Sequence, residues 1–294
     1  MAHEHSSDPS TVVNDCEMRV IGLQRSGNHP IIYWIMSQCN TRIFFLSDVR
    51  GASENPYATM SEFEEYNSGR LIRRLNLWDE HDSRKVQNGE IQDVNGVFGR
   101  KELLIYNHED QALSSICTNT FEENHDRWLG PSRQRFDILI MRDPFNLFAS
   151  RMKAGFLPGF LPRIKDFDRL TELWKEHATE YLSLSNLLPA PKVCINFNEW
   201  FTSTSYRAEL ARTLGLQFSD TSVNAVPEFG GGSSFDGLAF QGRAQQMQIT
   251  ERWKEFKDDA RYRTILADVE MLELSARIFG NVGTDIEIAR PLRK

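Results

Sequence analysis

The chain has 294 residues, of which 40% are hydrophobic and 26% charged, and its formal net charge is −7. This composition excludes an intrinsically disordered or a fibrous protein. A general nucleic-acid binder needs a basic surface, so the acidic balance argues against nucleic acid as a partner. The acidic net charge is still compatible with a local basic pocket for a small anion.

The four cysteines are widely spaced and form no CxxC pair. In a chain of this length they predict reduced residues, not a disulfide framework or a zinc site. No apolar run approaches the ~20 residues that span a bilayer, and the N-terminus lacks the order of a signal peptide. We therefore expect a cytoplasmic protein with no membrane partner, with residues 1–17 as a disordered leader and residues 18–294 as a single domain.

Short apolar stretches alternate with helical patterns along the chain. The stretches that predict buried strands are 18–23, 102–107, 136–141 and 192–197. The patterns that predict helices begin after the loop 24–29 and continue at 144–153, 167–188, 206–214 and 245–279. Strands separated by helices favour parallel pairing, so we expect an α/β fold, a three-layer sandwich around a central parallel sheet.

The segment SEFEEYNSGRLIRRLNLW, 61–78, is more weakly patterned. It predicts one or two helices broken at Ser68-Gly69. Arg70, Arg73 and Arg74 would then form a solvated helix face, or contact an anionic acceptor.

The first candidate site is GLQRSGNHP, Gly22 to Pro30, between the first strand and the first helix. Such a loop directs free backbone N–H groups and the positive end of the helix dipole towards one point. Arg25 adds a charge, while Ser26 and Gly27 let a phosphate approach the backbone. The motif predicts phosphate binding, with a plain strand–helix turn as the alternative. The pattern GxxxxGK[ST] is absent, so no metal is expected.

The second candidate site is RDPFNLFAS. Arg142 ends a predicted strand, where open α/β sheets bind their ligands, and Ser150 lies two turns into the following helix. Asp143 is a natural N-cap and Pro144 a natural first helical residue. The alternative is that these residues only begin a helix and that Ser150 only packs.

Together the two motifs resemble the sulfotransferases that use 3′-phosphoadenosine 5′-phosphosulfate (PAPS). KVCINFNEW and ITERWKEF resemble later segments of that family. The resemblance implies a P-loop NTPase-like fold, PAPS as co-substrate, PAP as product and no metal. It assigns the 3′-phosphate to Arg142 and Ser150. It assigns the 5′-phosphosulfate to Arg25, Ser26, Gly27, Asn28 and His29.

The resemblance also implies a base that takes the proton of the acceptor. His108 in ELLIYNHEDQ lies between the two phosphate motifs and is the first candidate, with Glu109 as its substitute. Arg25 would stabilise the charge that grows on the leaving phosphate. The acceptor would be a hydroxyl or amine of a small molecule or sugar. A metal-dependent nucleotide or metabolite kinase and a non-catalytic adenylate-binding protein remain the alternatives.

Overall fold

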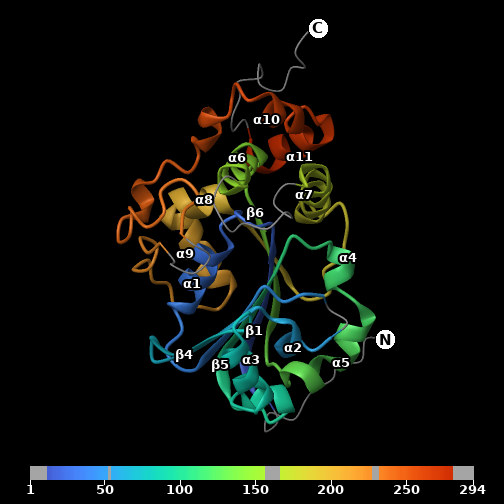
Figure 1. Ribbon diagram of the computed structural model, residues 1–294, viewed down its shortest axis with the longest axis vertical. Coiled ribbons are helices and arrows are strands. Elements are labelled where there is room, and N and C mark those ends of the chain that lie inside the picture. Colours follow the sequence, from blue (N-terminus) through green and yellow to red (C-terminus); the bar gives the residue numbers. More distant parts are fainter. Residues whose placement is uncertain (1–11, 52–53, 156–165, 227–231, 281–294) are drawn as a thin grey trace. The chain divides into compact units, whose positions relative to one another are not determined.

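The computed structural model describes residues 12–51, 54–155, 166–226 and 232–280 (Figure 1). Its strands form one seven-stranded sheet in the order β4-β3-β2-β5-β1-β6-β7. The sheet is mainly parallel and flanked by helices, which confirms the predicted α/β class.

The four strands predicted from apolar runs are all present. They are β1 (Asn14–Gly22), β5 (Lys101–Glu109), β6 (Arg135–Met141) and β7 (Lys192–Asn196). β1 begins four residues before the predicted strand, and the Asn14 side chain donates to the carbonyl of Leu129 at 3.1 Å. Residues 14–17 of the expected leader are therefore strand, while residues 1–11 lie outside the described residues.

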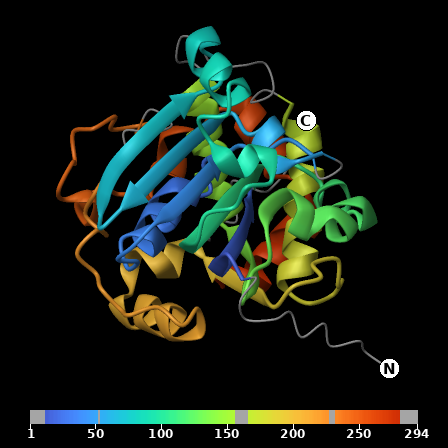
Figure 2. The same cartoon turned by 90° about the horizontal axis from the view of Figure 1, so that it is seen from below.

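The prediction of helix for 61–78 is wrong. The segment forms β3 (Glu62–Asn67) and β4 (Arg70–Asn76), an antiparallel hairpin (Figure 2). Ser68 and Gly69 have φ of 51° and 71°, and a two-residue turn with positive φ at both positions matches the twist of a hairpin. Ser68-Gly69 thus marks the turn between two strands and not a break in a helix.

Arg70, Arg73 and Arg74 lie on a strand, and two of them face carboxylates on the opposite strand. Arg74 pairs with Glu64 at 2.6 Å, and Arg73 pairs with Glu65 at 3.8 Å. Both pairs are direct cross-strand neighbours in the register. Cross-strand charge pairs stabilise a hairpin, so these charges serve strand pairing and not a helix face.

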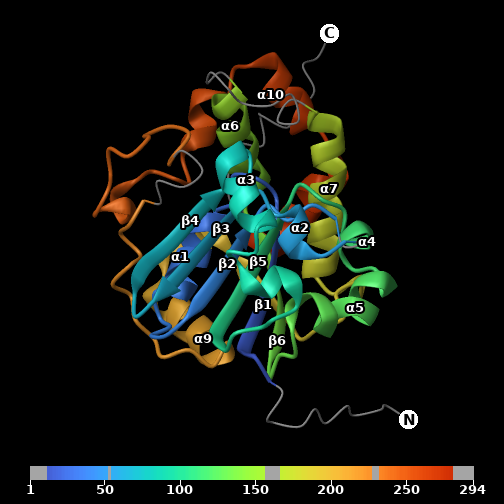
Figure 3. The same ribbon diagram turned by 60° about the horizontal axis from the view of Figure 1, so that its bottom comes forward.

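A further strand, β2 (Ile43–Ser47), was not predicted. It pairs antiparallel with β3 and parallel with β5, which brings the hairpin into the sheet (Figure 3). All five of its residues are buried. Phe44 of β2 packs edge-on against Phe63 of β3, with ring centroids 4.9 Å apart.

The helices follow the predicted pattern in part, since residues 245–259 of the predicted helical stretch 245–279 hold only short 3-10 turns. They are α1 (Asn28–Met36), α2 (Pro56–Thr59), α3 (Glu80–Gln87), α4 (Leu113–Ile116), α5 (Asn119–Leu129), α6 (Pro144–Gly155), α7 (Phe167–Tyr181), α8 (Phe197–Thr202), α9 (Thr204–Thr213), α10 (Ala260–Ile265) and α11 (Val269–Phe279), with 3-10 turns η1 (Gln92–Asn95), η4 (Ala244–Gln246) and η5 (Arg252–Glu255). α6 begins as predicted, because an Asp143 carboxylate oxygen accepts a hydrogen bond from the Asn146 N–H at 2.8 Å. α7 ends at Tyr181, seven residues earlier than predicted.

The chain forms two compact units. The first unit comprises the described residues within 1–21, 36–138 and 187–193, and the second those within 22–35, 139–186 and 194–294. Both candidate motifs, Gly22 to Pro30 and Arg142 to Ser150, belong to the second unit, whereas His108 and Glu109 belong to the first.

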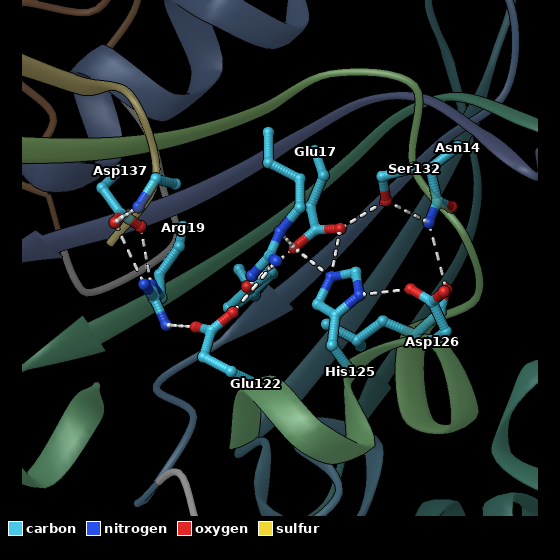
Figure 4. A network of polar contacts seen from close by, with 12 residues as sticks. Asn14, Glu17, Arg19, Glu122, His125, Asp126, Ser132 and Asp137 are labelled. Carbon is cyan, nitrogen blue, oxygen red and sulfur yellow. Dashed lines mark hydrogen bonds and ion pairs between the residues drawn. The ribbon is translucent and has the colours of Figure 1, made fainter. Parts of the chain in front are cut away.

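The first unit holds a buried network of charged side chains (Figure 4). Glu17 lies 2.8 Å from Nε2 of His125, whose Nδ1 lies 2.7 Å from Asp126. Tyr106 donates to Glu17 at 2.9 Å. Burial alone would raise the pKa of Glu17, but the charge of His125, aided by Arg135, lowers it to about 2. The network therefore joins β1, β5 and α5 through a stable carboxylate.

Candidate anion-binding site

The loop after β1 is a tight turn that opens α1. The Ser26 N–H donates to the Leu23 carbonyl at 3.1 Å, and the Asn28 side chain donates to the same carbonyl at 3.1 Å. Arg25 has a φ of 71°, in the left-handed region that non-glycine residues rarely adopt. Such strain is concentrated at functional sites.

Two glycines of this motif are required by close packing. A Cβ on Gly27 would overlap the ring of Phe197, and Gly27 also has a φ of 93°. A Cβ on Gly22 would overlap the side-chain oxygen of Asn28. Phe197, the first residue of α8, thus packs directly on the backbone of the first motif at Gly27.

Arg142 connects the two motifs. Its Nη1 donates to the Arg25 carbonyl at 3.0 Å and to the Ser150 hydroxyl at 3.1 Å. Its Nη2 donates to the Ile249 carbonyl at 2.8 Å, and its guanidinium lies 5.2 Å from the Phe197 ring centroid. The structure therefore brings together residues that are far apart in sequence, within the second unit.

A third arginine, Arg252 of η5, joins the same group. Its Nη1 lies 3.4 Å from the Ser150 hydroxyl, and its Nη2 donates to Ser233 at 2.8 Å and to Asp236 at 3.3 Å. We name Arg142, Ser150 and Arg252 the arginine–serine cluster. The sequence assigned Arg142 and Ser150 to a site, and the RW pair in ITERWKEF left open whether Arg252 faces the nucleotide, so Arg252 was not among the assigned site residues.

The arginines of this region repel one another. Burial lowers the pKa of Arg142 to about 9, and the charges of Arg252 and Arg25 act in the same direction. Burial also lowers the pKa of Arg252 to about 10, although Asp236 acts against this shift. Neighbouring cations that burial destabilises gain most from an added anion, so the arrangement suits a phosphate or sulfate group.

The remaining residues of the first motif are at least partly enclosed. Ser26 and Asn28 are buried, with 2% of each exposed. Burial lowers the pKa of His29 to about 4, aided by the charge of Arg25, so its imidazole is neutral at pH 7. At neutral pH the positive charge of this loop therefore comes from Arg25 and the backbone.

His108 is a buried, neutral residue of the first unit. Burial lowers its pKa to about 3, and Arg19 contributes to this shift. Its Nδ1 lies 3.0 Å from the Val49 carbonyl, which only accepts hydrogen bonds, so Nδ1 carries the proton. Its Nε2 is buried and has no hydrogen-bond partner among the described residues. This is the tautomer in which Nε2 can accept a proton.

Glu109 follows His108 at the end of β5 and is 9% exposed.

In the described part of the chain, no group of three His, Cys, Asp or Glu side chains is arranged to hold a metal ion. No helix in the same part is long and apolar enough to cross a bilayer.

No family model matches the chain, and no curated protein matches it in sequence. A solved structure similar to this one is that of the mouse sulfotransferase SULT7A1 complexed with PAP. The two share 11% identity with a TM-score of 0.45, over 94% of this chain and 88% of the other.

Proposed function

We propose that this protein transfers a sulfuryl group from PAPS to a hydroxyl or amine of a small molecule or sugar. The observation that carries the proposal is the position of Arg142. One nitrogen of its guanidinium contacts both the Arg25 carbonyl of the first motif and the Ser150 hydroxyl of the second, at 3.0 and 3.1 Å. A ligand with two phosphate-like groups fits two adjacent anion sites better than a ligand with one.

The arginine–serine cluster is the proposed site of the 3′-phosphate. Arg142 and Arg252 both reach the Ser150 hydroxyl, so an oxyanion there would receive charged hydrogen bonds from two directions. Ser150 would donate its hydroxyl proton to the same group. The Asp236 carboxylate, 3.3 Å from Arg252, is the anion that a phosphate would have to displace.

The loop of Arg25, Ser26 and Gly27 is the proposed site of the 5′-phosphosulfate. The N-terminus of α1 supplies N–H groups and the positive end of its dipole. Transfer of a sulfuryl group leaves negative charge on the 5′-phosphate. A cation about 4 Å away contributes on the order of 4 kcal/mol at an effective dielectric constant near 20, and Arg25 is the group proposed to supply it.

His108 is the proposed base, with Glu109 as the alternative. A neutral imidazole with Nδ1 protonated and Nε2 unprotonated is the form that accepts a proton from an attacking hydroxyl. Burial lowers the pKa of His108 and makes the free imidazole a weak base, so the acceptor hydroxyl would have to lie directly against Nε2 and lose its proton as the sulfuryl group is transferred.

The test is transfer of labelled sulfate from PAPS to a broad acceptor panel, with and without EDTA. We expect labelled product and PAP in both conditions, and loss of product with His108→Ala or with Glu109→Ala. Transfer from ATP that requires magnesium would instead favour a kinase. Binding of PAP without transfer to any acceptor would favour a non-catalytic adenylate-binding protein.

A further inference from the structure

The loop after β2 is attached to the segment that carries His108. The Asp48 N–H donates to the Asn107 side chain at 2.9 Å, and the Val49 N–H donates to the Asn107 carbonyl at 2.9 Å. The Val49 carbonyl lies 3.0 Å from His108 and 2.6 Å from the Gln111 side-chain nitrogen. Arg50, the next residue, is therefore held one position away from the group that orients His108.

Arg50 forms an exposed platform with Trp78. The guanidinium of Arg50 lies 4.4 Å from the centroid of the Trp78 ring, and the two residues are 41% and 62% exposed. The Trp78 backbone is fixed, since its N–H donates to the Asn76 side chain at 3.0 Å. An exposed tryptophan on an anchored backbone, stacked by a cation, is available to pack against a ring of a ligand.

Hydrogen-bond donors and hydrogen-bond acceptors surround this platform. Asp48 lies 3.4 Å from Arg50 and accepts from the Ser61 hydroxyl at 3.0 Å. Among the described residues, Asp48 is the one ion-pair partner of Arg50, which leaves further guanidinium N–H donors for a ligand. Burial raises the pKa of Glu62, next to Ser61, to about 7, and the charges of Glu64 and of Asp48 act in the same direction.

These groups select among ligand classes by charge. An anionic ligand would meet the carboxylate of Asp48, and a cationic ligand would meet Arg50. A neutral ligand with several hydroxyl groups can donate to the Asp48 carboxylate and accept from the guanidinium. The apolar face of a pyranose ring can also lie on the indole of Trp78.

We propose that Trp78, Arg50 and Asp48 bind the acceptor and that this acceptor is a neutral sugar. The proposal rests on the sulfuryl transfer proposed above and narrows its acceptor from small molecules in general to carbohydrates. The ring of the sugar stacks on Trp78, and two of its hydroxyls bond to Arg50 and Asp48. Val49 links this platform to His108, the proposed base.

The test is saturation-transfer NMR on the full chain without nucleotide. The probes are methyl glucoside, methyl galactoside, methyl N-acetylglucosaminide, cellobiose and maltose, with para-nitrophenol as an aromatic comparator. We expect transfer to the ring protons of at least one sugar, and affinity reduced about fivefold or more by Trp78→Ala and by Arg50→Ala. Ile72→Ala, at a residue of β4 that is 56% exposed, is the matched control and should leave binding unchanged.

Three results would overturn the assignment: no binding of any sugar, sugar binding that survives both variants, or binding of para-nitrophenol alone in a manner that depends on Trp78. Arg142→Ala separates this proposal from the proposed function, because it should leave sugar binding intact. If Arg142→Ala leaves PAP binding unchanged while Trp78→Ala removes sugar binding, the assignment of the nucleotide site is wrong and the assignment of the sugar platform is supported.

Discussion

Arg142 donates a hydrogen bond of 3.0 Å to the backbone carbonyl of Arg25, a residue 117 positions earlier in the chain. This contact joins the end of β6 to the turn that opens α1. Because Ser150 accepts from the same nitrogen, the contact also fixes the distance between the two candidate anion sites.

Arg252→Ala should weaken binding of 3′,5′-ADP roughly 30-fold, the effect of losing about 2 kcal/mol of charged hydrogen bonding. Ser150→Ala should weaken it about fivefold, as expected for one neutral donor. Binding of 5′-AMP should change little in either variant. Equilibrium titration measures all three, with the exposed Arg243→Ala as control. A loss equal for both nucleotides would place Arg252 away from the 3′-phosphate.

Gly27→Ala should destabilise the fold by about 2 kcal/mol or more. The new methyl group would overlap the Phe197 ring, and a φ of 93° disfavours any side chain. Gly215→Ala is the control: its φ is 68° but nothing lies within 4 Å, so only about 1 kcal/mol should be lost. Urea unfolding measures both. Phe197→Leu should partly rescue Gly27→Ala, and the absence of rescue would contradict the steric explanation.

The free energy of unfolding should fall as the pH drops from about 6.5 towards 3. His108 has a folded pKa of about 3, below its unfolded value of about 6.5, so the unfolded chain binds the extra proton in this window. The slope from this residue is up to about 1.4 kcal/mol per pH unit. Urea midpoints at successive pH values should show a shallower slope for His108→Gln, and the wild-type slope for the exposed His81→Gln. An unchanged slope in His108→Gln would mean that His108 is not buried in its neutral form.

Glu17→Gln should destabilise the protein by about 3 kcal/mol at pH 6, because it leaves the network of Figure 4 without its central carboxylate. Burial lowers the pKa of His125, but Glu17 raises it by more, so the pKa lies above its ordinary value. The stabilising charge of His125 is therefore fully present below its ordinary pKa and is lost as the pH rises through the raised pKa. Asp126→Asn, on the other side of the same imidazole, should cost less than about 1 kcal/mol because Asp126 is 68% exposed. Equal losses in thermal unfolding would contradict this ranking.

Neighbouring residues in the sequence were enough to predict several helix and strand boundaries. Arg142, Asp143 and Pro144 stand together, so the end of β6 and the start of α6 follow from neighbouring residues. The hairpin did not follow, because its positive-φ turn at Ser68-Gly69 also suits a helix break. The charge pairs between β3 and β4 could not be assigned without the register of the two strands, which places Glu64 opposite Arg74.

In the candidate anion-binding site, too, some residues could be assigned from the sequence while others depend on tertiary contacts. Arg25 and Arg142 were linked through resemblance to a family, since no periodicity connects residues so far apart. For the RW pair, the sequence left open whether Arg252 faces the nucleotide or only flanks a core Trp253, since the position of Arg252 in η5 depends on contacts with Ser150 and Ser233. Tertiary packing, and not local propensity, brings these residues together.

The most direct test of the central claim is calorimetric titration of the wild-type chain and of Arg142→Ala with 3′,5′-ADP and 5′-AMP. We predict that the wild type binds 3′,5′-ADP at least about 30-fold more tightly than 5′-AMP, and that Arg142→Ala binds the two equally. Equal dissociation constants for the two nucleotides in the wild type would contradict the account.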